Sequence, residues 1–136
     1  MMEIGKMFHF SSGHVLWRDD WDEDMNVKVF DKCSRQHGHN YSLTVAISGD
    51  VDEETGMIMN YYQLTDIVND RIIDIWDHRV LNDLQPFSEG VLPTAENMVL
   101  VVLDRMKEEF DQTAWKPSRI HVKETDKTFA EWRFGD

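Results

Sequence analysis

The sequence contains a single cysteine, Cys33, so no disulfide can form within the chain. It has no apolar run long enough to span a membrane, and its N-terminus lacks the basic-then-apolar pattern of a signal peptide. Both absences favour a soluble cytoplasmic protein. Proline and glycine are scarce, with 3 and 7 residues, and nothing resembles a linker or a repeat. Residues 1–136 are therefore expected to form one domain with its own core.

Positive charge is also scarce. The chain has 14 basic residues, scattered along its length, against 26 acidic ones, and its net charge is -12. A nucleic-acid-binding surface normally needs a stripe or patch of Lys and Arg. We therefore expect neither a nucleic-acid nor a membrane partner, and the composition favours a small-molecule ligand.

Two histidines, His37 and His39, flank a glycine where an alternation of polar and apolar residues begins. This alternation predicts a strand over residues 39–48. Residues two apart in an extended segment share a face, so the two imidazoles are expected to project side by side and to suit one metal ion. The alternative is that this His-x-His pair only makes hydrogen bonds in a loop.

A catalytic zinc usually takes three protein ligands and keeps one open position. His14, which directly follows a predicted strand over residues 2–12, is the candidate third ligand because that strand could lie beside the second one. Only three residues separate Cys33 from His37, and the nearby thiol and third histidine favour a metal site over the loop alternative. A structural zinc would instead recruit Cys33 as a fourth ligand.

The remaining pattern predicts an α+β fold. The acidic, aromatic stretch between Leu16 and Asp31 predicts an exposed loop. Helical spacing predicts one helix from the N-cap Asn60 to about Trp76 and another that follows the N-cap Thr94. Strands are predicted around residues 120–124 and over 128–134. The order ββααββ indicates a four-stranded antiparallel sheet with both helices on one face.

Two further features carry possible chemistry. Asp77 and His78 fall at the end of the first predicted helix, where they form either a helix cap or a proton-transfer pair. Glu124 shares a strand face with two apolar residues, Ile120 and Val122. Its carboxylate either reaches solvent or accepts hydrogen bonds from a ligand in a pocket.

Several spaced motifs together resemble the 6-pyruvoyltetrahydropterin synthase family over nearly the whole chain. They are Phe10-Ser11-Ser12-Gly13-His14, residues 33–39, Thr55-Gly56-Met57, Asp77-His78, Leu81-Asn82, Pro93-Thr94-Ala95-Glu96-Asn97 and Val122-Lys123-Glu124-Thr125. The resemblance implies a T-fold (tunnelling fold) whose trimers close into a barrel, and a homo-hexamer of two trimers.

The resemblance also implies roles for particular residues. It implies that Zn²⁺ is bound by His14, His37 and His39. It implies that protons are transferred by Cys33, Asp77 and His78. It also implies that Glu124 anchors the pterin. Thr94 and Glu96 are expected to complete the pterin pocket. For Thr94, a role as helix N-cap alone is the alternative.

The family has two branches, and the sequence carries marks of both. The short spacer between Cys33 and His37 resembles the 6-carboxytetrahydropterin synthases of the queuosine pathway. This resemblance implies a lyase, 6-carboxy-5,6,7,8-tetrahydropterin synthase, that acts on 7,8-dihydroneopterin triphosphate. The segment 57–60 and the long loop before Cys33 resemble the biopterin branch, which makes 6-pyruvoyltetrahydropterin. The spacer sets where the thiol lies relative to the metal, so the carboxy branch is favoured. A non-catalytic zinc- or pterin-binding protein is the remaining alternative.

Overall fold

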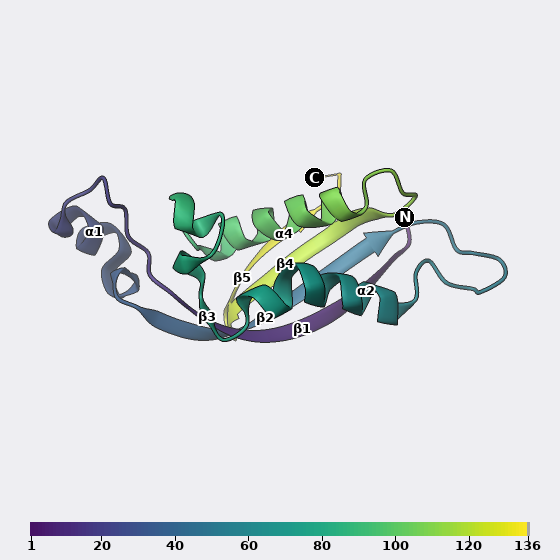
Figure 1. Ribbon diagram of the computed structural model, residues 1–136, viewed down its shortest axis with the longest axis horizontal. Helices are drawn as coiled ribbons and strands as arrows, with labels where there is room; N and C mark the ends of the chain where they lie inside the picture. Colours follow the sequence, from purple (N-terminus) through teal and green to yellow (C-terminus); the bar gives the residue numbers. More distant parts are fainter. Residues whose placement is uncertain (136) are drawn as a thin grey trace.

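The computed structural model describes residues 1–135. Within them, five strands form one sheet in the order β3-β1-β2-β4-β5 (Figure 1). Neighbouring strands are antiparallel except β1 and β3, which run parallel. The strands are β1 (Glu3–His14), β2 (His37–Ser48), β3 (Arg79–Val80), β4 (Lys116–Thr125) and β5 (Thr128–Arg133).

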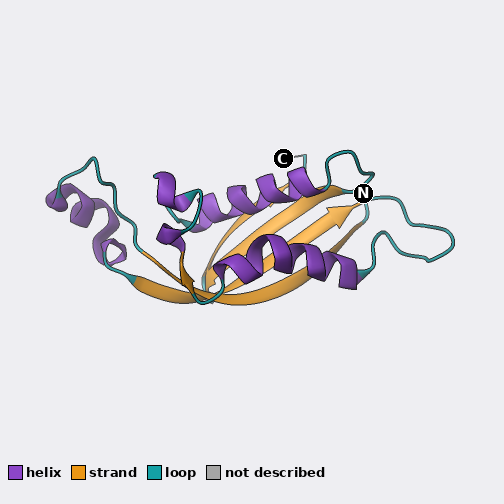
Figure 2. Ribbon diagram, viewed as in Figure 1, coloured by secondary structure: helices purple, strands orange, loops and turns teal. Residues whose placement is uncertain are grey.

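Two long helical segments cover one face of this sheet (Figure 2). The first runs from α2 (Tyr61–Val68) through a π-helical turn, Asn69–Ile73, into α3 (Asp74–Trp76). The second is α4 (Ala95–Glu109). Helix α1 (Glu23–Phe30) lies apart from them, beyond the end of β1 and start of β2 (Figure 1). Short 3₁₀ turns occupy Asp31–Ser34, Leu81–Asp83 and Phe87–Glu89.

The core lies between the sheet and these helices. Alternate residues of the strands point toward the helices, as the period of two requires. Buried strand residues therefore meet the apolar stripes of α2 and α4, and they include Phe8, Phe10, Tyr41, Leu43, Val45, Ile120 and Val122. Full burial of such a side chain contributes about 1.5–3 kcal/mol. No helix within residues 1–135 is long and apolar enough to cross a membrane.

Both predicted N-caps are present. The Asn60 side chain accepts a hydrogen bond of 2.8 Å from the backbone N–H of Tyr62. Thr94 Oγ1 accepts one of 3.1 Å from the N–H of Asn97. Each bond satisfies one of the N–H groups that a helix start leaves without a partner, so these two positions fix where α2 and α4 begin.

The predicted four-stranded antiparallel sheet is wrong in one respect, because the sheet also contains β3, which pairs in parallel with Ser12 and Gly13 of β1. Strand β3 has only two residues, too few for the alternation of polar and apolar residues that predicts a strand. The predicted bounds of the first two strands were also too short. Strand β1 continues to His14 and β2 already begins at His37, so both histidines belong to the ladder.

The predicted loop between Leu16 and Asp31 is also wrong, since it contains α1. The Asp22 side chain accepts from the N–H of Met25 and caps this helix. The fully buried Asn26 side chain bonds the backbone N–H and carbonyl of Arg18, which ties the helix to the preceding segment. A capping aspartate followed by two more acidic residues is a helix-start signal that the charge pattern obscured.

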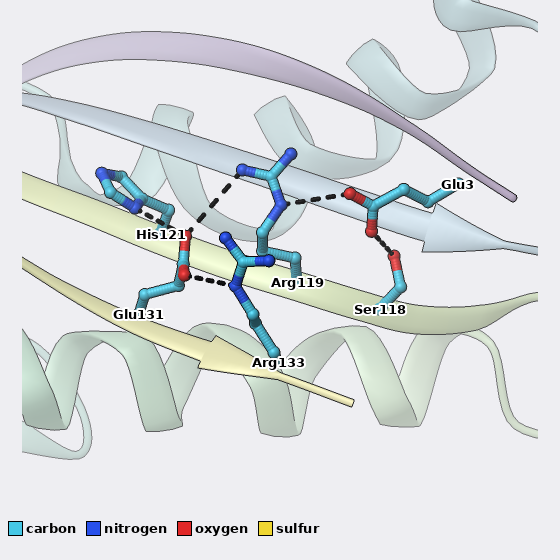
Figure 3. Close-up of polar contacts among 6 residues, drawn as sticks. All are labelled: Glu3, Ser118, Arg119, His121, Glu131 and Arg133. Carbon is cyan, nitrogen blue, oxygen red and sulfur yellow. Dashed lines mark hydrogen bonds and ion pairs between the residues drawn. The ribbon is translucent and has the colours of Figure 1, made fainter. Parts of the chain in front are cut away.

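A polar cluster lies on the sheet face that the helices leave uncovered (Figure 3). Glu131 of β5 lies at its centre and accepts hydrogen bonds from His121 Nδ1 at 2.9 Å and Arg133 Nε at 2.6 Å. Arg119 of β4 reaches across to Glu3 of β1 at 3.2 Å. These contacts join three strands of the sheet, including its edge strand β5.

Replacing Glu131 by Gln is expected to lower the free energy of unfolding by about 1–2 kcal/mol at pH 7. Partial burial opposes ionisation of Glu131, but the hydrogen bonds from Arg133 and His121 outweigh it and lower the pKa of this carboxyl. Its contribution is therefore full above the ordinary glutamate pKa and is lost as the pH falls through the lowered one.

Urea unfolding of wild type and Glu131→Gln at several pH values measures this effect. The stability difference should be constant near neutrality and should shrink in acid. Glu53→Gln, which neutralises an exposed carboxylate in the loop after β2, is the control and should leave stability unchanged. Equal stability of Glu131→Gln and wild type at pH 7 would contradict the role given to the cluster.

Candidate metal and active site

The strand ladder brings three histidines together. His14 at the end of β1 is paired directly with His37 at the start of β2. Opposed residues of antiparallel strands share a face, and His39, two positions along β2, lies on the same face. The ligand nitrogens of His14, His37 and His39, called here the histidine trio, all lie within 4.8 Å of one another. The loop alternative for His37 and His39 is therefore wrong, because both belong to β2.

Backbone carbonyls hold two of these rings in place. His14 Nδ1 lies 2.8 Å from the carbonyl oxygen of Pro93, and His37 Nδ1 lies 2.7 Å from that of Arg35. A carbonyl oxygen only accepts, so each Nδ1 carries the proton and each Nε2 of a neutral ring keeps a free lone pair. Metal-binding histidines usually donate their other N–H in this way.

The free nitrogens converge on one point. Nε2 of His14 and Nε2 of His37 are 2.9 Å apart, so in the neutral rings two lone pairs face each other. His39 Nε2 is buried and makes no hydrogen bond among residues 1–135, although Glu124 Oε1 lies 3.4 Å away. Buried polar atoms are normally paired, and a cation bound between the rings would satisfy their free nitrogens.

Burial favours the neutral form of two of these rings, His14 and His39. Burial is the main cause that lowers the pKa of His14, and the neighbouring His37 lowers it further against the opposing hydrogen bond to Pro93. Burial likewise lowers the pKa of His39, although the charge of Glu124 opposes it. Neutral imidazole is the metal-ligating form of histidine, so both shifts favour coordination.

The trio fits a tetrahedral ion. Zn–N bonds of about 2.0–2.1 Å place tetrahedral nitrogens about 3.3 Å apart. Nε2 of His14 and Nε2 of His37, 2.9 Å apart, lie close to that spacing. Three nitrogen ligands leave a fourth position free. The three histidines could therefore hold one metal ion and leave room for a further ligand.

Glu124 lies beside the trio, with Oε1 3.4 Å from His39 Nε2. Its side chain is 23% exposed, so it is accessible to a ligand. Strand β4 presents it next to Ile120 and Val122, and a bulge after Lys123 interrupts the pairing with β5 there. Glu124 is thus partly buried beside His39 rather than fully in solvent, and acceptance of hydrogen bonds from a ligand stays a prediction.

Cys33 lies in the 3₁₀ turn Asp31–Ser34 and is half-buried. Its carbonyl accepts a 2.8 Å hydrogen bond from the N–H of Leu16, two residues after His14, so its backbone is held close to the trio. Burial raises the pKa of Tyr41, a buried neighbour of the trio, and the negative charges of Glu124 and Cys33 raise it further. Both groups therefore lie within electrostatic reach of the same phenol.

Asp77 and His78 follow α3 and form an ion pair, with Asp77 Oδ1 2.9 Å from His78 Nδ1. The backbone N–H of Ser11 also donates to Asp77, and this bond is the main cause that lowers the Asp77 pKa. The carbonyl of Ser11 accepts from the N–H of His78, which has a positive φ of 59°. The His78 side chain is 82% exposed and shares a hollow with His39.

No contact with the trio is found for Thr94 or Glu96 among residues 1–135. Thr94 follows Pro93, whose carbonyl holds His14, and its hydroxyl is used as the cap of α4. Glu96 is exposed in the first turn of that helix. The structure therefore shows the capping function of Thr94, and a pterin contact of either residue stays a prediction.

Sequence reasoning missed the groups that orient the trio. The carbonyls of Pro93 and Arg35 are backbone atoms, and no side-chain pattern announces them. Tyr41, which stands edge-on to His14 and His39, was assigned only to the strand. Its place two residues after His39 on the same face of β2 was the signal that could have identified it.

Comparison with known proteins gives one consistent family. Residues 3–134 match the family described as 6-pyruvoyl tetrahydropterin synthase. The chain is 33% identical over 124 residues to the 6-pyruvoyl tetrahydrobiopterin synthase of Dictyostelium discoideum, covering 91% of this chain and 90% of that protein. It is 28% identical over 136 residues to the 6-carboxy-5,6,7,8-tetrahydropterin synthase of Bacillus subtilis, covering 96% and 84%.

The fold agrees with the sequence match. The structure of Caenorhabditis elegans 6-pyruvoyl tetrahydropterin synthase superposes with a TM-score of 0.87 at 25% identity, covering 97% of this chain and 94% of that one. The match spans the strands that carry the histidine trio as well as the covering helices. The chain therefore belongs to the 6-pyruvoyl tetrahydropterin synthase family.

Proposed function

We propose that this protein is a zinc-dependent 6-carboxy-5,6,7,8-tetrahydropterin synthase. Its substrate would be 7,8-dihydroneopterin triphosphate, a precursor in the queuosine (7-deazaguanine) pathway, and its released products acetaldehyde and triphosphate. The observation that carries the proposal is that three imidazole nitrogens lie within 4.8 Å of one another, with the backbone of Cys33 held nearby. A set of three imidazoles with a free fourth position is typical of catalytic rather than structural zinc.

His14, His37 and His39 would hold the ion. When bound, zinc supplies a Lewis acid that polarises a side-chain oxygen of the substrate and stabilises the negative charge that develops on proton removal. The carbonyls of Pro93 and Arg35 keep two of the rings oriented for that task.

Proton transfer falls to Cys33 and to the pair of Asp77 and His78. Cys33 would remove a proton from the substrate side chain as a thiolate. His78 would return or relay a proton, because Asp77 accepts from its Nδ1 and leaves Nε2 free to exchange one. Triphosphate would leave by elimination. Hydrolytic cleavage of a side-chain carbon–carbon bond, which consumes one water molecule, would then leave the 6-carboxylate and release acetaldehyde.

Glu124 would anchor the pterin. An ionised carboxylate accepts two parallel N–H hydrogen bonds, and the amino-pyrimidinone edge of a pterin presents such a pair. Its position 3.4 Å from His39 Nε2 supports this role, because an anchored ring would then place its side chain beside the trio. Thr94 and Glu96 would complete the pocket at the start of α4.

Glu124→Gln is expected to weaken binding of neopterin roughly tenfold to a hundredfold, because the amide can accept only one of the two N–H bonds. Fluorescence titration measures the affinity, and metal analysis should show that zinc is retained. Glu53→Gln makes the same charge change in a distant loop and should bind like wild type. Unaltered affinity of Glu124→Gln would remove the anchor.

The choice of branch rests on the spacer of three residues between Cys33 and His37. The relative from Bacillus subtilis that is named a 6-carboxy synthase supports it. The second candidate is 6-pyruvoyltetrahydropterin synthase, which the name of the Dictyostelium relative favours and which keeps the side-chain carbons.

Incubating the zinc-loaded protein with dihydroneopterin triphosphate distinguishes these candidates. The carboxy branch releases acetaldehyde in step with 6-carboxytetrahydropterin, whereas the pyruvoyl branch releases triphosphate without acetaldehyde. Binding of the pterin with no turnover would favour a non-catalytic zinc- or pterin-binding protein over both.

We also propose that the chain acts in the cytoplasm as a homo-hexamer of two trimers. The uncovered sheet face and the edge strand β5 support assembly, because an unpaired edge can pair with the sheet of another copy. Light scattering should give a mass of six chains. A monomer at micromolar concentration would contradict the proposed assembly.

A further inference from the structure

A hollow of about 400 Å³ lies where β3 runs beside the end of β1, next to the start of β2. This volume is within the range of small-molecule sites. The trio member His39 and the proton-transfer candidate His78 both line it, and the remaining lining residues are Ser11, Ser12, Gly13, Gly38, Asn40, Arg79 and Val80. The hollow therefore adjoins the groups to which the reaction has been assigned.

The charge of this hollow is unusual for the chain. Its lining contains the cation Arg79 and no carboxylate, in a protein with 26 acidic residues. Three other hollows that contain arginine also contain carboxylates, one beside Arg18, one beside Arg71 and one beside Arg119. The nearby Asp77 is engaged by the N–H of Ser11 and by His78. Of these four hollows among residues 1–135, the first is the one whose lining offers an anion a positive charge without a carboxylate beside it.

The lining also presents unused donors. The Arg79 side chain has no ion pair or hydrogen bond to any of residues 1–135 and is exposed. Ser11 Oγ donates to Asn40 Oδ1 at 2.6 Å, which orients the amide and leaves its NH₂ group free. Gly13 and Gly38 face each other across the ladder, and a Cβ at Gly38 would lie 3.2 Å from the carbonyl oxygen of Ser12. The hollow is therefore open down to the backbone.

From this geometry we propose that the hollow binds a condensed phosphate chain, with the Arg79 guanidinium and the Asn40 amide as its donors. Arginine is suited to phosphate because its planar fork donates two parallel hydrogen bonds. The proposal rests on the proposed function, in which the substrate carries a triphosphate and the reaction releases one. It names the subsite that recognises that group, whether attached to the pterin or free.

Titration calorimetry with inorganic triphosphate at fixed ionic strength tests the subsite directly. Zinc-loaded wild type should bind it, and Arg79→Gln should bind roughly tenfold to a hundredfold more weakly. Lys116→Gln removes the same charge at the start of β4, beside the end of β2 and away from the hollow, and should bind like wild type. Asn40→Asp keeps the side-chain shape but adds a negative charge, so it should also lose affinity.

Zinc content, neopterin affinity and KM for the triphosphate substrate are also measured. Arg79→Gln should retain zinc and neopterin affinity, because neither depends on phosphate, and KM for the triphosphate substrate should rise by the same factor as the triphosphate dissociation constant.

Loss of affinity for free triphosphate with unchanged KM would assign the subsite to free triphosphate alone and overturn its role for the substrate. Equal triphosphate affinity of wild type, Arg79→Gln and Asn40→Asp, or an equal loss in Lys116→Gln, overturns the subsite itself. Failure of the proposed function would appear separately, as absent pterin binding or turnover in wild type.

Discussion

His39→Ala is expected to lose bound zinc and to retain less than about 1% of wild-type turnover. His39 supplies one of three imidazole nitrogens that lie within 4.8 Å of one another, so its removal leaves a two-ligand site. The fold should survive, because the imidazole lies near the start of β2 and outside the main apolar cluster. Metal analysis of the purified variant measures the stoichiometry, and circular dichroism checks the fold.

His9→Ala provides a matched control for this prediction. His9 lies on β1, is exposed, and bonds the hydroxyl of Ser42 at 3.1 Å, away from the trio. It should keep one zinc per chain and normal turnover. Full zinc stoichiometry in His39→Ala, or an equal loss in His9→Ala, would show that the metal does not depend on the trio.

Cys33→Ala is expected to keep zinc and to lower kcat by about 10²–10⁴-fold, the usual contribution of a positioned proton-transfer group. The thiol belongs to a turn that is held to Leu16 by a backbone bond, so the substitution leaves that attachment intact. Loss of turnover should therefore occur without loss of metal or of pterin affinity. Steady-state kinetics together with metal analysis and neopterin titration separate these effects.

Ser34→Ala provides the control for Cys33→Ala. Ser34→Ala changes the next residue of the same turn and removes a hydrogen bond to the carbonyl of Asp31, so it reports on disturbance of the turn alone. It should reduce kcat far less than Cys33→Ala. Near-normal product formation by Cys33→Ala would contradict the proton-transfer role, and loss of zinc would instead identify the thiol as a ligand.

Much of the fold could be predicted because its strongest signals are local. The alternation in β2 and the helical stripes are visible in consecutive residues, and the N-caps Asn60 and Thr94 are single-residue signals. Strand β3 was missed because it consists of two residues and exists only through pairing with β1. Helix α1 was missed because its acidic first turn was assigned to solvent, although Asp22 caps it.

The three histidines of the candidate site could also be predicted from local signals. His-x-His at a strand start fixes two imidazoles on one face, and a second strand that ends in histidine can supply a third. Their orientation could not be predicted, because it depends on backbone carbonyls of Pro93 and Arg35 that only the folded chain brings into place. The hollow beside Arg79 was likewise out of reach, since β3 forms one of its walls.

X-ray absorption spectroscopy of the zinc-loaded protein identifies the atoms bound to the metal. We predict three imidazole nitrogens and one exchangeable oxygen, all at about 2.0–2.1 Å, with no sulfur. A sulfur at about 2.3 Å would make Cys33 a fourth ligand and the site a closed structural one. That result would contradict the assignment of the trio and its neighbouring thiol to catalysis.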